Sequence, residues 1–209
     1  MRIKVYILVV LALALFVMPI AAQAGEHTAQ SREYQIKAAF LYNFIKFVDW
    51  PKGKIGDSDE PIIIGIIGED PFGDVFEPIK DKKVKGRSIV IKRFKGFEEL
   101  KKSSGEDKAE LARKIEALRK CHLLFICSSE KKNLKEIINS VKDHSVLTVG
   151  EMEGFLESGG IINFLMEEKK VRFEVNIVAA RQAGLEIRSK LLRLAKRVVK
   201  EDTARKKQK

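Results

Sequence analysis

Three nearly uninterrupted apolar runs constrain the fold of this chain more than any other feature of its sequence. They occupy residues 62–67, 122–127 and 145–149, and they are rich in isoleucine, valine and leucine. A strand with one solvated face alternates apolar and polar side chains, whereas a strand buried on both faces is apolar along its length. We therefore predict three buried strands, and a further strand at residues 88–94.

Segments with helical periodicity lie between and around these strands. Helices are predicted at 33–48, at 70–79, at 108–118 and after a serine cap at Ser129, with one helical turn at 97–102. Strands that alternate with helices through short connections predict an α/β domain. We expect a mainly parallel sheet with helices on both faces, a three-layer arrangement of the Rossmann-like or flavodoxin-like kind.

The last part of the chain follows a different pattern. Two extended runs, 161–166 and 171–176, are joined by four charged residues, which predicts an antiparallel β-hairpin at an edge of the sheet. Helices are predicted to follow at 177–183 and at 187–199. One domain is thus expected to cover residues 33–199.

The predicted first helix is apolar over about half of its circumference. Its polar side is narrow and consists of Tyr42, Asn43, Lys46 and Asp49. A helix with so wide an apolar face is expected to contact a second protein as well as its own core. Trp50 precedes a proline and ends the helix, because a residue before proline avoids the helical conformation.

Residues 1–24 have the three-part layout of a secretory signal peptide. A basic start precedes an apolar run at 5–20, and small residues then form a cleavage site. We predict export from the cytoplasm, a mature chain that begins at Gly25, and a disordered start at 25–32. A retained membrane anchor is the alternative, since the apolar run is only slightly shorter than a membrane-spanning helix.

The chain has a net charge of +11, and part of the excess lies in a basic tail at residues 200–209. Basic tails often bind nucleic acid, but an exported protein does not meet nucleic acid, so none is expected as a partner. Two interpretations of the tail remain. It is a solvated, disordered end, or it makes a weak contact with an anionic membrane surface or an acidic partner.

The two cysteines, Cys121 and Cys127, lie at the ends of one predicted strand. Six steps along a strand span roughly 20 Å, whereas a disulfide needs Cα atoms within about 7 Å of each other. The two cysteines are therefore not expected to bond to each other. Each is a buried thiol or pairs between chains.

Residues suited to catalysis or metal binding are scarce. The histidines are His27, His122 and His144, and each is interpreted as structural. Cys121 and His122 are adjacent on a strand and point to opposite faces, so they cannot act as nucleophile and base. No pair of His, Cys, Asp or Glu has the spacing of a metal site. We expect no catalytic residues, no metal and no cofactor, and a protein that is not an enzyme.

Polar residues follow two neighbouring parallel strands where each strand ends. Gly68, Glu69 and Asp70 follow the first strand, and Ser128 and Ser129 follow another. Sheets of this kind bind ligands beyond the carboxyl ends of their strands. These residues are candidates for a small-molecule crevice, although the glycines are also explained by the turn from strand to helix.

Polar residues also interrupt the apolar hairpin, at Asn163, Glu174 and Asn176. Buried polar groups need hydrogen-bond partners, so these side chains tie the hairpin to a helix end or mark a recognition site. Gly159 and Gly160, just before the hairpin, allow a tight turn or a close approach of backbone.

Several stretches occur in an order and spacing that together resemble one family. They are Ala38–Phe44 with Trp50–Pro51, Ile64–Gly68, Cys121–Ile126, Val146–Gly150, Gly159–Asn163, Phe173–Asn176 and Ser189–Ala195. The chain resembles the YfiR-like family of periplasmic regulatory proteins, from about residue 33 to residue 196.

The resemblance implies a periplasmic α/β protein that is often dimeric and is not an enzyme. Founding members of the family restrain an inner-membrane diguanylate cyclase by binding its periplasmic sensor region, and so lower cyclic di-GMP output and biofilm formation. Cys121 matches a family cysteine that commonly bonds to one upstream. This chain departs from the family there, because no cysteine precedes Cys121.

We therefore expect a periplasmic protein that represses or modulates an inner-membrane signalling protein through protein–protein contact, and that forms a homodimer. A periplasmic small-molecule-binding module is the alternative. The expected partner or dimer surface combines first-helix and hairpin residues, namely Phe40, Tyr42, Phe44, Phe47, Asn163, Glu174 and Asn176.

Overall fold

A seven-stranded sheet forms the centre of the molecule in the computed structural model, which describes residues 18–55, 60–77 and 82–200, with side chains from residue 31 onward. The strand order is β3-β2-β4-β5-β6-β7-β9. The strands are β2 (Ile62–Ile67), β3 (Ile89–Phe94), β4 (Leu123–Ile126), β5 (Leu147–Gly150), β6 (Ile162–Glu167), β7 (Lys170–Asn176) and β9 (Arg197–Val199).

The first five strands of this order are parallel, β7 runs antiparallel to β6, and β9 runs parallel to β7. The register places Ile64 beside Leu123 and Leu123 beside Leu147. All four residues of β4 and of β5 are buried. The predicted α/β class, with a mainly parallel sheet and an added hairpin, is confirmed.

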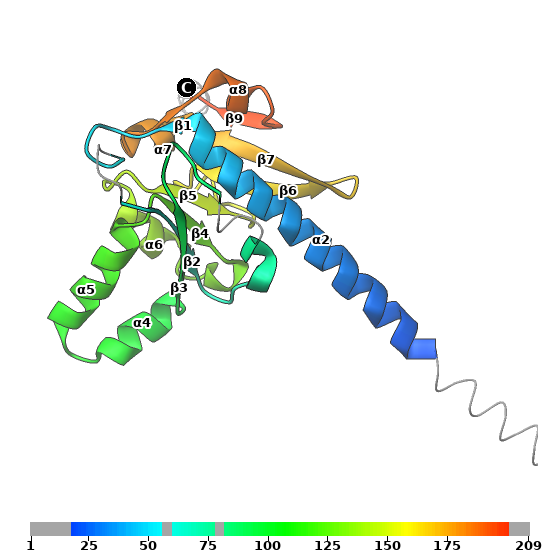
Figure 1. The fold of residues 1–209 in the computed structure, drawn as a ribbon. Coiled ribbons are helices and arrows are strands. Elements are labelled where there is room, and N and C mark those ends of the chain that lie inside the picture. Colours follow the sequence, from blue (N-terminus) through cyan, green and yellow to red (C-terminus); the bar gives the residue numbers. More distant parts are fainter. Residues whose placement is uncertain (1–17, 56–59, 78–81, 201–209) are drawn as a thin grey trace, which may run out of the picture.

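Helices cover both faces of the sheet (Figure 1). One face carries α2 (Met18–Phe47), the 3₁₀ helix η1 (Gly73–Phe76), α7 (Ile177–Gln182) and α8 (Ser189–Leu192). The other carries α4 (Phe97–Ser104), α5 (Lys108–Arg119) and α6 (Leu134–Val141). Each face has its own apolar core, because successive strand residues such as Ile66 and Ile67 point to opposite sides.

The first helix is longer than expected. α2 begins at Met18 and passes through residues 25–32, and its amino-terminal part projects from the body (Figure 1). Pro19 lies in the first turn, where proline is tolerated. The expected signal peptide falls mainly on residues 1–17, outside the described residues, and it remains a prediction. No helix among the described residues combines the length and apolarity of a membrane span.

The helix predicted at 70–79 is only partly present. Asp70 accepts the backbone N–H of Phe72, as a capping residue would, but only the single 3₁₀ turn η1 follows. Gly73 has φ +51°, a left-handed conformation that interrupts an α-helix at its start. The expected end at residue 79 lies outside the described residues.

The helix predicted at 187–199 is wrong. The segment forms β8 (Glu186–Ile187), α8 and β9 instead, and β8 pairs with β1 (Val48–Asp49). β9 adds a strand beside β7. Leu194, an apolar residue of this segment, is 64% exposed. Backbone hydrogen bonds to β1 and β7 decide the conformation of this segment, and its helical periodicity does not.

Ser129 does not cap the following helix. It lies in η2 (Ser128–Glu130), and Asn133 occupies the N-cap position of α6. The antiparallel hairpin is confirmed, with Glu168 and Lys169 in left-handed conformation at its turn. Its expected place at an edge of the sheet is wrong, because β9 pairs with β7 beyond it. Left-handed residues suit the twist of a two-residue hairpin turn.

Candidate functional site at the carboxyl edge of the sheet

The carboxyl ends of β2 and β4 are joined by a specific contact. The backbone N–H of Glu69 donates to Ser129 Oγ at 3.0 Å. Gly68 has φ +100°, and a Cβ atom at this position would lie 2.5 Å from Ser129 Oγ. Glycine is thus required where the chain leaves β2, and Ser129 holds that turn.

The carboxylate of Asp70 shapes the loop that follows β2. One oxygen accepts the backbone N–H of Phe72 at 2.7 Å, and the other accepts Arg93 Nε at 2.6 Å. Arg93 also donates to the carbonyl of Gly73 at 2.6 Å. The side chain of Asp70 therefore ties the loop to β3.

Glu130 is a buried acid at the same edge, 5% exposed. One of its carboxylate oxygens accepts the backbone N–H of Phe97 at 3.1 Å and Asn133 Nδ2 at 3.3 Å. Phe97 is the first residue of α4, whose N-cap Gly96 has no side chain to offer. A distant glutamate therefore stabilises the positive end of this helix.

A buried ionic cluster lies beside these loops, on the α2 side. Lys37, 4% exposed, pairs with Glu33 on its own helix and with Glu151, the first residue after β5. The Tyr34 hydroxyl donates to Glu151 at 3.0 Å, and the Lys37 ammonium lies 4.4 Å from the centre of the Tyr34 ring. Burial, and then the Glu151 carboxylate, raise the pKa of Tyr34.

Sequence reasoning missed this cluster, although a signal was present. Lys37 lies at the middle of the apolar face of the first helix, between positions that pack into the core. A cation on a buried face requires a carboxylate partner. The partner could not be named from the sequence, because Glu151 is 114 positions away.

The residues predicted as a crevice all lie along this edge, but they border three separate hollows. Gly68, Glu69 and Ser129 border a hollow of about 510 Å³ toward α4. Asp70 borders one of about 670 Å³ between η1 and α2, and Ser128 borders one of about 240 Å³ beside the ionic cluster. The structure brings the residues to one edge without forming a single crevice.

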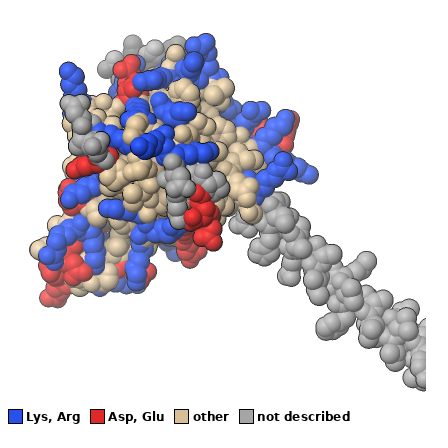
Figure 2. Space-filling view, in the orientation of Figure 1, with Lys and Arg blue, Asp and Glu red and all other residues tan. Residues whose placement is uncertain are grey.

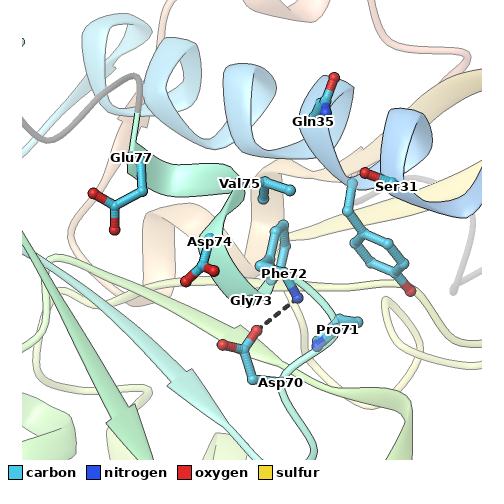
Figure 3. Close-up of a pocket in the computed structure, with 10 residues that line it drawn as sticks. Ser31, Gln35, Asp70, Pro71, Phe72, Gly73, Asp74, Val75 and Glu77 are labelled. Carbon is cyan, nitrogen blue, oxygen red and sulfur yellow. Dashed lines mark hydrogen bonds between the residues drawn. The ribbon is translucent and has the colours of Figure 1, made fainter. Parts of the chain in front are cut away.

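The hollow between η1 and α2 combines apolar and acidic walls. Figure 3 shows Ser31 on α2 across from Asp70 on the loop after β2 and Asp74 on η1. The ring of Phe72 packs edge-on against Tyr34, with centroids 5.2 Å apart. Such walls suit a small ligand that has an apolar part and a positively charged group.

The two thiols lie at opposite ends of β4, Cys127 beneath these loops and Cys121 before the strand, in the apolar cores of opposite faces. Cys121 and Cys127 are buried and form no disulfide, so the prediction that they do not bond to each other is confirmed. Burial raises the pKa of Cys121 to about 12. Burial, and then the carboxylates of Asp70 and its neighbours, raise the pKa of Cys127. A thiol that stays protonated is a poor nucleophile.

His122 holds neighbouring backbone in place. The backbone N–H of Ile63 donates to His122 Nδ1 at 3.0 Å, and His122 Nε2 lies 3.1 Å from the carbonyl of Lys54. Because Nδ1 accepts a hydrogen bond and Nε2 faces a carbonyl oxygen, the neutral imidazole carries its proton on Nε2. Burial lowers the pKa of His122.

The polar residues of the hairpin have partners inside the molecule. Asn163 Oδ1 accepts the backbone N–H of Met152 at 3.0 Å. Asn176 caps α7 and donates to the carbonyl of Leu156 at 3.1 Å. Glu174 forms a bidentate pair with Arg197 of β9. These contacts agree with the interpretation that the polar side chains hold the hairpin to neighbouring segments. A role of the three residues at a partner surface stays a prediction.

The aromatic residues of α2 differ in their surroundings. Phe44 has no exposed surface, and its ring contacts Phe164 and Phe173. Phe40, Tyr42 and Phe47 are half-buried. Phe44 therefore belongs to the core of the monomer, and a partner surface on α2 would have to use the other residues.

No group of three or more His, Cys, Asp or Glu side chains within the described part of the chain is arranged to hold a metal ion. The charged side chains of Asp70, Glu130, Lys37 and Glu151 at the sheet edge are engaged in loop contacts, capping and the ionic cluster. This edge can therefore bind through its hollows, while its polar groups mainly hold the loops in place.

Comparison with known proteins defines the class of protein. The sequence model of the DUF4154 family, described as YfiR/HmsC-like, matches residues 34–196. The match includes most of the described domain, and the chain belongs to this family. The family is known for periplasmic regulation of cyclic di-GMP signalling, and it is regulatory and not enzymatic. No curated protein matches the chain.

Two solved structures match this chain at low sequence identity. A conserved domain protein from Vibrio cholerae O1 biovar El Tor has 11% identity and a TM-score of 0.49, over 79% of this chain and 60% of that one. The ABC domain in complex with L-Trp from Streptococcus pneumonia has 10% identity and a TM-score of 0.44, over 66% of this chain and 55% of that one. This chain thus spans about 60% or less of the length of these two structures.

Proposed function

We propose that this protein is a periplasmic regulator that binds the periplasmic region of an inner-membrane diguanylate cyclase and represses it by contact. The observation that carries the proposal is the family match over residues 34–196. A regulator of this kind acts by population shift. It binds the inactive state of its partner more tightly than the active state, and so lowers the output of cyclic di-GMP.

An exposed apolar patch on α2 and the hairpin supports a protein–protein contact. Ile36 is 42% exposed and Met166 is 47% exposed. Phe40, one turn after Ile36, packs against Phe164 of β6, with ring centroids 6.0 Å apart, and Met166 is two residues beyond Phe164. We define the hairpin patch as Ile36, Phe40 and Met166. Apolar residues that cluster at the surface are typical of interaction sites.

Capture of the partner from solubilised inner membranes tests this proposal. Ile36→Asp and Met166→Asp place a charge on the hairpin patch, and each is expected to weaken capture by about tenfold or more, the range of a hot-spot residue. The control is Val90→Asp, because Val90 is an exposed apolar residue on β3, at the far edge of the sheet. Unchanged capture by both folded patch variants would refute this surface.

Homodimer formation is a separate part of the proposal. The same variants are compared by sedimentation equilibrium, which reports mass without a partner. If the hairpin patch is the dimer surface, Ile36→Asp and Met166→Asp should yield monomers while Val90→Asp does not. Loss of partner capture with an intact dimer would assign the patch to the partner alone.

A small-molecule-binding module is the second candidate, and the hollow between η1 and α2 favours it. Its volume of about 670 Å³ lies within the range of ligand sites. A thermal-shift screen of metabolites that carry an amine and an aromatic or aliphatic part tests this candidate. A shift that Asp74→Asn abolishes would support it, and no shift from any compound would count against it.

A further inference from the structure

Basic side chains gather at the end of the molecule where the last turns of α2 meet the residue 82–87 turn. The ammonium groups of Lys46 and Lys82 lie 5.3 Å and 5.9 Å from the centre of the Tyr42 ring. The Tyr42 hydroxyl donates to the carbonyl of Lys83 at 3.4 Å. Figure 2 shows Lys and Arg gathered over this part of the surface.

The segment around α8 continues the same basic surface. The backbone N–H of Arg188 donates to the carbonyl of Phe47 at 2.9 Å, which places the segment at the end of α2. Beside it, Phe47, Arg188, Lys190 and Arg193 border a shallow hollow of about 640 Å³. We define the cationic end as Lys46, Lys82, Lys83, Lys190 and Arg193.

The described carboxylates near this end pair with other cations or form no ion pair with the five residues. Asp49 accepts hydrogen bonds from Lys85 and, in bidentate form, from Arg188. Glu186 also borders the hollow. Among the described residues, no carboxylate forms an ion pair with any of the five residues of the cationic end.

The sheet face that carries α4, α5 and α6 differs in its ion pairs. Salt bridges join its basic and acidic residues within and between helices, as in Lys101–Glu98, Lys101–Glu136, Lys114–Glu110 and Arg119–Glu116. Ion pairs therefore neutralise several cations of the helical face, whereas among the described residues none neutralises the five cations of the cationic end.

We propose that the cationic end binds an anionic membrane surface. The five cations come from three separate segments, and they lie beside one exposed apolar side chain and two half-buried aromatic side chains. Leu194, 64% exposed, follows Arg193 directly, and Tyr42 and Phe47 are half-buried among the cations. Cations interspersed with exposed apolar residues are typical of proteins that lie on an anionic bilayer.

A fluid bilayer fits this arrangement better than an acidic protein does. The hollow at this end is shallow and open, and only Lys190 and Arg193 of the cationic end border it, so the five charges do not line a closed groove. A lipid surface supplies phosphates wherever a cation lies, so it needs no matching geometry. The proposal is independent of the hairpin patch, because Tyr42 and Lys46 lie on a different side of α2 from Ile36 and Phe40.

Vesicle binding by the processed chain tests the proposal. The probe is co-sedimentation with phosphatidylcholine vesicles that do or do not contain phosphatidylglycerol. We expect binding only with phosphatidylglycerol, and loss of binding at about 1 M salt, where charges are screened beyond about 3 Å. A Lys near an anionic surface changes binding about fivefold. The triple variant Lys82→Glu, Lys83→Glu, Lys190→Glu should therefore bind on the order of 100-fold more weakly.

Matched controls separate the cationic end from general charge and from the basic tail. Lys102→Glu, Lys108→Glu, Lys120→Glu makes the same change of net charge on the α4–α5 face, where all three side chains are exposed. This control, and a chain that ends at Lys200, should keep most of the binding. An equal loss in the control, or a complete loss in the shortened chain, would overturn the proposal.

A further arm distinguishes a membrane from an acidic protein. Leu194→Ser should weaken binding to the anionic vesicles while leaving binding to soluble poly-glutamate unchanged, since only a bilayer accepts an apolar side chain. Binding to poly-glutamate with none to vesicles would assign the cationic end to an acidic protein and refute the proposal. Circular dichroism of each variant verifies that it is folded.

Discussion

Lys37, in the middle of α2, pairs with Glu151, which lies 114 positions later at the end of β5. The pair joins the first helix to the carboxyl edge of the sheet, and both side chains are almost fully buried. A buried ion pair adds little net stability by itself, but removal of one partner leaves an uncompensated charge in the core.

Replacement of Lys37 by methionine should therefore destabilise the fold strongly. Lys37→Met leaves Glu33 and Glu151 without their cation, and the expected loss is about 3–5 kcal/mol in the free energy of unfolding. Urea denaturation measures it. Lys46→Met, an exposed site on the same helix, should change stability by less than about 0.5 kcal/mol. Equal losses of unfolding free energy in the two variants would show that Lys37 does not form the buried ion pairs with Glu33 and Glu151.

The burial of His122 predicts that the folded protein loses stability in mild acid. Burial lowers the pKa of its imidazole below 6.5, so in acid the unfolded chain binds a proton more readily than the native chain does. The stabilisation is complete above pH 6.5 and declines as the pH falls toward the lowered value. Protonation would also place a hydrogen on Nδ1, which accepts the N–H of Ile63.

Thermal unfolding at a series of pH values between about 7.5 and 5 measures this effect, whose slope approaches about 1.4 kcal/mol per pH unit. His122→Asn should flatten the dependence. The pKa of His144 is also lowered. His144→Asn therefore serves as the comparison, and the stability of the double variant should depend least on pH. An unchanged slope in all three variants would show that carboxylates control the acid response.

The buried thiols predict a loss of stability in alkali. Burial raises the pKa of Cys121 from 9.0 to about 12, and that of Cys127 is raised as well. The unfolded chain ionises both thiols near pH 9, whereas the native chain keeps them protonated. The stabilisation is therefore complete below pH 9 and declines as the pH rises through the native pKa.

Urea unfolding between about pH 8 and pH 11 measures the alkaline effect, with a slope that approaches about 1.4 kcal/mol per pH unit for each thiol. Cys121→Ala should reduce the slope while lowering stability at pH 7 through the small cavity it creates. Native protein should also resist thiol-specific labelling until it unfolds. Rapid labelling at neutral pH would contradict the burial of both thiols.

The ring of Phe155 packs against Gly150 and Gly160 and leaves no room for a side chain at either position. A Cβ atom at Gly160 would lie 2.2 Å from the ring of Phe155, and one at Gly150 would lie 2.4 Å from it. Gly160→Ala should therefore destabilise the protein by at least about 1–3 kcal/mol, the usual cost of overpacking. Phe155→Leu should recover part of that loss in the double variant. Additive effects of the two substitutions would argue against the contact.

Periodicity and two-sided burial were enough to predict most elements of the fold. β2, β4 and β5 appear as apolar runs because each is covered on both faces, and the hairpin appears as two extended runs around a charged turn. The helix predicted at 187–199 is wrong because β8 and β9 pair with strands that are distant in sequence. Periodicity within one segment carries no information on such pairing.

The polar residues at the strand ends were predicted to lie together, and they share one edge of the sheet. Their distribution over three hollows depends on α2 and η1, which cover the edge from one side. The ionic cluster of Lys37, Tyr34 and Glu151 was missed for the same reason. Its members come from segments that meet only when the first helix packs on the sheet.

The sequence by itself therefore determined the α/β class, the positions of the buried strands along the chain and the resemblance to a regulatory family, because side-chain pattern and residue type are local properties. Only the tertiary structure decided that Phe44 is core, that Lys37 is neutralised by Glu151, and that five cations without an ion pair among the described residues share one end. Burial and electrostatic environment are set by neighbours across space, and the chain brings those neighbours together only when it folds.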